Sequence, residues 1–207
     1  MSPRPYQRAR RQAAAEQTRA RVLAAAHDLL AASDDLAGFS VDAVAADAGV
    51  ARMTVYYQFG SKRGLLEALF DELATRGQIG EHLAAAFQRP DPLEALAAFV
   101  TAFGQFWGAD RLAMRRLRAL SALDSEFEQA VRARDERRRQ GLRVLVERLA
   151  ARRRRPSFGD LDQVVDLLHT LTSFETFDTL AGPTRTPEDV APLVERLARA
   201  ALALDAR

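Results

Sequence analysis

Residues 40–59 read SVDAVAADAGVARMTVYYQF, and their residue pattern is the strongest structural signal in the chain. Its first half repeats apolar residues at helical spacing, which predicts a short helix with one buried face. These residues are Val41, Val44, Ala45 and Ala48. Gly49 follows them, and glycine adopts the left-handed backbone of a tight turn without steric cost. The stretch therefore predicts two short helices that meet at a glycine.

The second half predicts a helix over residues 52–58 whose outer face is chemically mixed. Val55 and Phe59 fall on its inner side by helical spacing. Hydrogen-bond donors, acceptors and an apolar group then share the outer face, as a helix lying in the DNA major groove requires. The outward side chains are Arg52, Met53, Thr54, Tyr56 and Gln58.

Residues 18–66 resemble the DNA-binding domain of the TetR family of transcriptional regulators. The resemblance rests on several motifs in one order and spacing, and it covers about a quarter of the chain. It implies that Thr54, Tyr56 and Lys62 contact the DNA backbone or an adjacent thymine. The motifs are Thr18-Arg19, Phe39-Ser40, Ala45-Ala46-Asp47-Ala48-Gly49-Val50, Thr54-Val55-Tyr56-Tyr57-Gln58-Phe59 and Ser61-Lys62.

Contacts with DNA divide into those that position the protein and those that read bases. For reading, arginine at position 52 suits guanine, glutamine at position 58 suits adenine, and the methionine at position 53 can pack on a thymine methyl group. For positioning, hydroxyl and ammonium donors can hold phosphates, and a serine at position 40 also caps the first helix. These donors are Ser40, Thr54, Tyr57 and Lys62.

Some of these positions also have a structural interpretation. Tyr57 fits a buried core or interface position as well as an exposed one, whereas we expect Tyr56 to be exposed. Met53 would otherwise be a buried filler, and Lys62 an ordinary solvated lysine.

The composition predicts an all-α protein, and the motifs with the resemblance to TetR regulators imply an N-terminal three-helix helix-turn-helix domain and a larger C-terminal helical bundle. The chain has 207 residues, of which 48% are hydrophobic, with only 8 prolines and 11 glycines. The absence of cysteine excludes disulfides and thiolate metal sites. No segment reads as a signal peptide or a membrane span, so we expect a cytoplasmic protein. The net charge is only +2, a weak electrostatic signal for DNA.

We expect three segments along the chain. Residues 1–15 are basic and contain two prolines, which favours a disordered arm. Residues 16–62 are the DNA-binding domain, and residues 63–207 are the effector-binding and dimerisation domain. The arm could follow the DNA backbone or enter the minor groove through Arg8, Arg10 and Arg11.

Helical periodicity and proline breaks predict long helices outside the reading stretch. The arginine-rich run at 132–155 is interleaved with acids, which favours a solvated helix face over a second DNA surface. The expected helices span 16–32, 61–76, 80–88, 92–107, 110–121, 124–154, 160–181 and 187–204.

Aromatic and methionine residues of the C-terminal segment predict a pocket for an apolar or aromatic small molecule of unknown identity. An ordinary helical core explains each residue equally well, and the resemblance to TetR regulators favours the pocket. The candidate lining is Phe103, Trp107, Met114, Leu117, Leu120, His169, Ser173 and Phe174.

One short recognition helix touches few base pairs, so adequate affinity requires two copies of the chain. The two copies would read half-sites about 34–36 Å apart, or a multiple of this distance. The last two helices are apolar on more than one stripe, and we expect them to form a four-helix seam in a homodimer. The candidate seam residues are Phe177, Val190, Leu193, Leu197 and Ala201.

Catalysis has little support in this sequence. His27, His82 and His169 are scattered, and neither a nucleophile–base pair nor a phosphate-binding glycine loop is present. We therefore expect no enzyme, no cofactor and no metal. The sequence predicts a homodimeric repressor that binds a palindromic double-stranded DNA operator and is released by an effector. The alternative is a small-molecule-binding or enzymatic helical protein with a vestigial helix-turn-helix.

Overall fold

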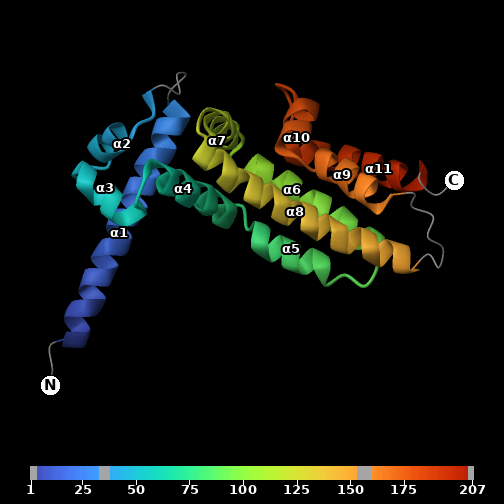
Figure 1. The fold of residues 1–207 in the computed structure, drawn as a ribbon, viewed down its shortest axis with the longest axis horizontal. Helices are drawn as coiled ribbons and strands as arrows, with labels where there is room; N and C mark the ends of the chain where they lie inside the picture. The colour runs from blue at the N-terminus through green and yellow to red at the C-terminus, as the bar shows by residue number, and fades with distance from the viewer. Residues whose placement is uncertain (1–3, 33–37, 153–159, 205–207) are drawn as a thin grey trace. The chain divides into compact units, whose positions relative to one another are not determined.

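A computed structural model describes residues 4–32, 38–152 and 160–204, and all regular elements in these ranges are helices (Figure 1). This confirms the all-α fold class. The chain divides into two compact units. The first contains residues 1–72 and 115–128, and the second contains residues 73–114 and 129–207. The expected domain boundary at residue 62 stays a prediction. The first compact unit extends past residue 62 through most of the following helix, and it also includes a later segment of the chain.

The N-terminal unit is built on three helices that share one small core. Val22, Val44 and Val55 come from three different helices and are each at most 1% exposed. Leu65 and Leu66 on the next helix are also fully buried. The four helices are α1 (Arg4–Ala32), α2 (Val41–Asp47), α3 (Arg52–Phe59) and α4 (Lys62–Arg76).

Helix α1 begins much earlier than the sequence predicted. It starts at Arg4, so residues 4–15, expected to be a disordered arm, continue the helix instead. Pro5 is tolerated in a first turn, and the following alanines, arginines and glutamines have high helix propensity. Periodicity missed this segment because it has no apolar stripe. Residues 1–3 lie outside the described ranges.

The turn between α2 and α3 has the predicted left-handed glycine. Gly49 has φ +62, and its N–H donates to the Ala46 carbonyl at 3.1 Å. The Val50 N–H donates to the Ala45 carbonyl at 3.0 Å, which closes the end of α2. At the other end, the Ser40 hydroxyl accepts a hydrogen bond from the Ala43 N–H at 3.1 Å. Both ends of this seven-residue helix are therefore satisfied locally.

The C-terminal unit is arranged around α6, which packs against α5, α10 and α11. Helix α6 lies very close to α10 and α11 at Gly104, where an added Cβ would lie 3.0 Å from the Ala191 Cβ and 3.1 Å from the Phe177 ring. Helix α7 passes from this unit into the N-terminal one, where Arg116 donates to the Leu30 carbonyl. The helices are α5 (Ile79–Phe87), α6 (Pro92–Ala109), α7 (Arg111–Leu123), α8 (Ser125–Arg152), α9 (Leu161–Leu171), α10 (Phe174–Ala181) and α11 (Pro187–Leu204).

The expected single helix over 160–181 was wrong, because the chain breaks after Leu171 into α9 and α10. Ser173 begins α10 as its N-cap, and its hydroxyl accepts from the Thr176 N–H at 3.2 Å. Serine favours this role over a helix interior. The apolar stripe continues across the break, which is why periodicity alone did not reveal it. The predicted end of the preceding helix at residue 154 lies outside the described ranges.

The backbone at Gly49 gives a test of the turn. Gly49→Ala should lower the free energy of unfolding by about 1–2 kcal/mol, because an L-residue is strained at this positive φ. The control is Gly80→Ala in α5, where a Cβ meets no atom within 4 Å and φ is not positive. That variant should be neutral or up to about 1 kcal/mol more stable. Urea unfolding of both variants measures the difference, and equal losses would contradict the turn's role.

Candidate nucleic-acid interface

Helix α3 exposes to solvent the side predicted to contact DNA, which we call the reading face. Tyr57 is 90% exposed and Met53 is 72% exposed, whereas Val55 on the opposite side is 1% exposed. Of the two interpretations of Tyr57, the structure favours the exposed one, and Met53 is not a buried filler. Arg52 is also exposed, while Thr54, Tyr56 and Gln58 are partly exposed. Large side chains on an exposed short helix are available for contact with a partner.

Arg52, the predicted base reader, is held by two neighbours. Its Nη1 donates to the Asp42 carboxylate at 2.9 Å, and its Nη2 donates to the Tyr56 hydroxyl at 3.2 Å. The guanidinium carbon lies 5.5 Å from the centroid of the Tyr56 ring. The hydrogen bond to Tyr56 and the nearby Asp42 charge raise the pKa of Arg52 above its ordinary value. The guanidinium is thus oriented between α2 and α3.

The far end of α3 is tied to α1. Arg19 donates to the Gln58 carbonyl at 3.3 Å, and its guanidinium lies 4.5 Å from the centroid of the Phe59 ring. The Gln58 side-chain amide donates to the Ala15 carbonyl at 3.5 Å, the long limit of a hydrogen bond. Reading a base with Gln58 would therefore replace only a weak contact.

Two of the predicted phosphate-binding groups, Ser40 and Lys62, lie at the start of α2 and of α4, whereas Thr54 and Tyr57 lie on α3. Ser40 accepts the capping bond of α2 through its hydroxyl oxygen, which leaves the hydroxyl proton able to donate. Lys62 begins α4, and its Nζ lies 5.9 Å from the centroid of the buried Phe39 ring. Cationic and hydroxyl donors at these positions can hold phosphates.

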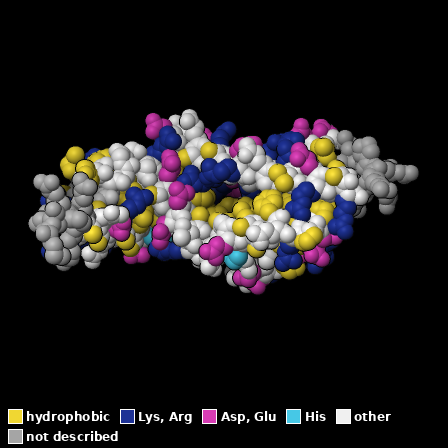
Figure 2. Space-filling model, turned by 90° about the horizontal axis from the view of Figure 1, so that it is seen from below, with side chains coloured by type: hydrophobic (Ala, Val, Ile, Leu, Met, Phe, Trp, Pro, Cys, Tyr) yellow, Lys and Arg dark blue, Asp and Glu magenta, His cyan; other side chains and the backbone are white. Residues whose placement is uncertain are grey.

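Charges of both signs are mixed on the face that Figure 2 shows. On the face drawn in Figure 2, Lys and Arg side chains are interspersed with Asp and Glu side chains, in keeping with a net charge of +2. No large field of one sign covers that face. Binding of a polyanion would consequently depend on particular side chains and on local charge.

The C-terminal unit contains a continuous line of buried aromatic rings. Phe99 lies 4.9 Å from Phe103 between ring centroids, Phe103 lies 5.6 Å from Trp107, and Trp107 lies 5.7 Å from Phe174. These four side chains are at most 6% exposed. Such pairs add to the stability that burial of their area provides.

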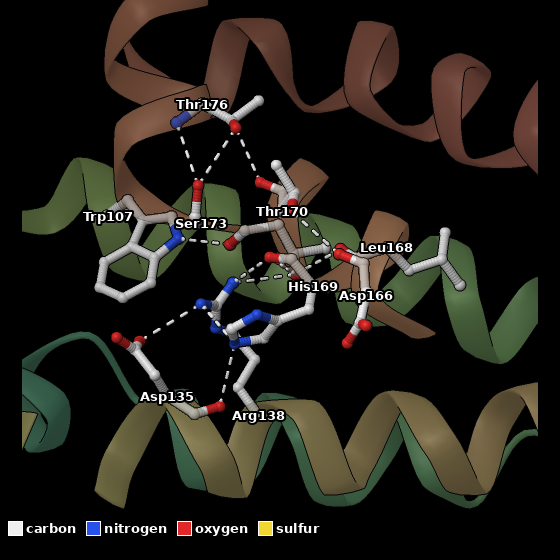
Figure 3. Close-up of polar contacts among 10 residues, drawn as sticks. Trp107, Asp135, Arg138, Asp166, Leu168, His169, Thr170, Ser173 and Thr176 are labelled. Atoms are coloured by element: carbon white, nitrogen blue, oxygen red, sulfur yellow. Dashed lines mark hydrogen bonds and ion pairs between the residues drawn. The ribbon is translucent and has the colours of Figure 1, made fainter. Parts of the chain in front are cut away.

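Beside these rings, Arg138 of α8 is buried at the break between α9 and α10 (Figure 3). Its Nη1 donates to the His169 carbonyl at 2.7 Å and to the Thr172 hydroxyl at 3.1 Å. Its Nη2 lies 2.9 Å from the His169 Nε2 and 3.2 Å from the Asp135 carboxylate. The guanidinium carbon is 5.7 Å from the centroid of the Phe103 ring. We call Arg138 and its hydrogen-bonding partners Asp135, His169 and Thr172 the Arg138 node.

Trp107 completes the same arrangement from α6. Its indole N–H donates to the Thr172 carbonyl at 3.1 Å (Figure 3). The last carbonyls of a helix have no partner within it, and burial without one is costly. Arg138 and Trp107 satisfy those at the end of α9, so a buried charge and an indole stabilise the break.

Residues 22–69 match the sequence profile of the family described as Bacterial regulatory proteins, tetR family. This N-terminal domain belongs to the TetR family. The match spans α2, the Gly49 turn and α3, in agreement with the resemblance at residues 18–66. The TetR-type domain is the DNA-binding part of a transcriptional regulator. A search of curated protein sequences found no match.

Solved structures share the fold over nearly the whole chain. A TetR-like transcriptional regulator from Rhodococcus sp. RHA1 is 25% identical, with a TM-score of 0.67 over 91% of this chain and 96% of that one. A transcriptional regulator from Pseudomonas aeruginosa PAO1 is 20% identical, with a TM-score of 0.72 over 92% and 91%. NalD, the secondary repressor of the MexAB-OprM multidrug efflux pump in P. aeruginosa, is 22% identical, with a TM-score of 0.64 over 90% and 96%. The TetR-type domain is therefore followed by a helical domain, as in these proteins.

The residues predicted to line an effector pocket divide between the two compact units. Leu117 and Leu120 are buried in the N-terminal unit. The remaining six lie in the C-terminal unit, where His169 and Ser173 are partly exposed and the others are buried. These six are Phe103, Trp107, Met114, His169, Ser173 and Phe174.

A cavity of about 370 Å³ opens elsewhere in the C-terminal unit, between α5, α6 and α11. His82, Arg89, Glu94 and Arg199 line it together with alanines, and none of the predicted pocket residues does. Sequence periodicity missed this cavity because its lining is small or polar.

The predicted seam residues differ in accessibility within one chain. Phe177 and Val190 are fully buried and Ala201 is 8% exposed, so these three belong to the protomer core. Leu193 is partly exposed and Leu197 is 40% exposed. Only the last two can meet a second copy without the core opening.

The arginine-rich helix α8 is neither a plain solvated face nor a free cationic surface. Arg139 pairs with Asp166 at 2.7 Å, and Arg143 pairs with Asp162, both on α9. Asp166 of α9 is therefore held by an arginine of α8. In the described ranges, no cluster of three or more His, Cys, Asp or Glu residues could hold a metal ion. No helix there is long and apolar enough to cross a bilayer.

The Arg138 node can be tested by truncation. Arg138→Ala should lower the free energy of unfolding by about 2–4 kcal/mol, because it leaves buried carbonyl and hydroxyl groups unsatisfied and a void beside Phe103. The control is Arg137→Ala, an exposed arginine one position earlier on α8, which should change stability by less than about 0.5 kcal/mol. Denaturant unfolding of the two variants checks this, and equal small losses would refute the role of the node.

The node also predicts a dependence of stability on pH. Burial and the Arg138 charge lower the pKa of His169 below its ordinary value of about 6.5. The unfolded chain then binds more protons on acidification, so the free energy of unfolding should fall as the pH drops below about 6.5. His169→Gln should flatten this fall, as measured by urea midpoints between about pH 7.5 and 5.5. An unchanged slope would mean that His169 does not titrate in this way.

Proposed function

We propose that this protein is a cytoplasmic homodimeric repressor that binds a palindromic DNA operator and is released by a small-molecule effector. The observation that supports it is the exposed face of α3, where Arg52, Met53 and Tyr57 project from a helix fixed by the buried Val55. In this proposal Arg52, Met53 and Gln58 read bases. The phosphate contacts come from Ser40, Thr54, Tyr56, Tyr57 and Lys62.

We expect dimerisation because each protomer reads DNA through one short helix. A single α3 of eight residues covers few base pairs, so two copies of this helix related by a two-fold axis are needed for selective binding. The exposed Leu197 and partly exposed Leu193 on α11, with the exposed Leu167 on α9, are apolar groups suited to a seam between copies. Helices α9 and α11 pack against each other, so these groups come from adjacent elements.

The effector proposal rests on the buried rings of Phe99, Phe103, Trp107 and Phe174, which we call the aromatic cluster, and on the Arg138 node. An apolar or aromatic molecule would pack against Phe103, Trp107 and Phe174, with His169 and Ser173 as polar contacts. NalD is by name a repressor of an efflux pump, which agrees with this class of regulator. Effector binding and DNA binding would then oppose each other through a coupling free energy of about 1–3 kcal/mol.

The function is tested by selection from a random duplex library with the full-length protein, followed by footprinting upstream of its own gene. Arg52→Ala should relax preference at one base position in each half-site, by roughly 5- to 150-fold. Lys62→Ala should weaken all sequences alike and reduce the salt dependence by about one phosphate contact. Wild-type protein that selects no sequence, or that binds as a monomer, would overturn the proposal.

The effector is tested with the single tryptophan of the chain. Trp107 lies within the aromatic cluster, so a molecule that binds there should change its fluorescence. A broad library of apolar and aromatic compounds is screened for this change and for release of the selected operator. The alternative, a small-molecule enzyme or carrier with a vestigial helix-turn-helix, predicts binding without any effect on DNA and no phenotype for Arg52→Ala.

A further inference from the structure

Asp42 is an acidic side chain at the reading face, where a negative charge opposes binding of DNA. It lies in the first turn of α2, its side chain is 61% exposed, and its carboxylate bonds Arg52 at 2.9 Å. The proposed DNA contacts are otherwise cationic or neutral. A carboxylate there weakens attraction to phosphates. It is favourable at the N-terminus of α2, and it also acts on a neighbouring side chain.

That neighbour is Arg52. A free arginine on an exposed helix has many rotamers, and its flexible charge can bind any nearby phosphate. The Asp42 carboxylate from α2 and the Tyr56 hydroxyl from one turn along α3 hold the guanidinium from two sides. Arginine has five N–H donors, and these two bonds use two of them. Three donors therefore remain for the edge of a base while both restraints persist.

We propose that Asp42 is a specificity-determining residue, which positions the Arg52 guanidinium for a base edge and keeps it from acting as a mobile phosphate-binding cation. This inference rests on the proposed function. Asp42 contacts no base itself and acts through Arg52. It trades affinity for all DNA against discrimination between sequences, in the manner of a repulsive element in a specific interface.

The test is Asp42→Asn in the full-length protein, with binding measured to the operator selected by the wild type and to its single-base variants. Affinity for non-operator duplex should rise about 3- to 10-fold at low salt, and the salt slope should steepen by about one. Discrimination at the position that Arg52→Ala relaxes should fall about 5-fold or more. Adding Arg52→Ala to Asp42→Asn should cost little further discrimination, because the two residues act together.

The matched control is Asp47→Asn, which removes the same charge from the other end of α2. It should raise non-specific affinity without loss of preference at that base position. Thermal unfolding followed by circular dichroism confirms that both variants are folded. Preserved discrimination in Asp42→Asn, or an equal loss in Asp47→Asn, would overturn the role of Asp42 while leaving the proposed function intact. Wild-type protein without any sequence preference would overturn both.

Discussion

A helix of eight residues is too short to be stable by itself in water, so α3 depends on what it packs against. Val55 anchors it in the small core, and Arg19 of α1 holds its last turn through the Gln58 carbonyl and the Phe59 ring. Because the inner side is fixed in this way, the outer side is fixed too. The exposure of Met53 and Tyr57 is a consequence of the burial of Val55. The orientation of Arg52 in turn depends on α2 lying beside α3.

In the C-terminal unit, the end of helix α9 is buried. Where α9 stops, the carbonyls of His169 and Thr172 need partners away from water. Arg138 and Trp107 provide them from α8 and α6. A buried guanidinium is costly unless it is hydrogen-bonded, and here several acceptors and the face of Phe103 surround it. Arg138 therefore contacts both the helix break after Leu171 and the buried aromatic rings. Because His169 is part of the same group of contacts, its protonation should affect how these residues pack.

Local patterns in the sequence were sufficient for much of the architecture. The spacing of Val41, Val44 and Val55 and the place of Gly49 predicted two short helices and their turn, since helix periodicity and left-handed glycine act over a few residues. The α1 extension was missed because residues 4–15 are helical by propensity and carry no apolar stripe. The break after Leu171 was missed for the opposite reason, because the apolar stripe runs through it. The burial of Phe177 and Val190 could not be separated from an exposed seam, because both uses require the same apolar residue types.

Residue patterns alone were enough to predict a helical chain, a glycine turn between two short helices near residue 49, and the residue types on the outer side of the second helix. Which charges pair with each other became known from the packing of the helices. Asp42 and Arg52 are 10 positions apart, and Arg138 and His169 are 31 apart. Nothing in the local pattern distinguishes Arg138 from the exposed Arg137 beside it. Burial and ion pairing depend on how helices pack. A side chain's partner on another helix is set by three-dimensional distance, which periodicity along one helix does not encode.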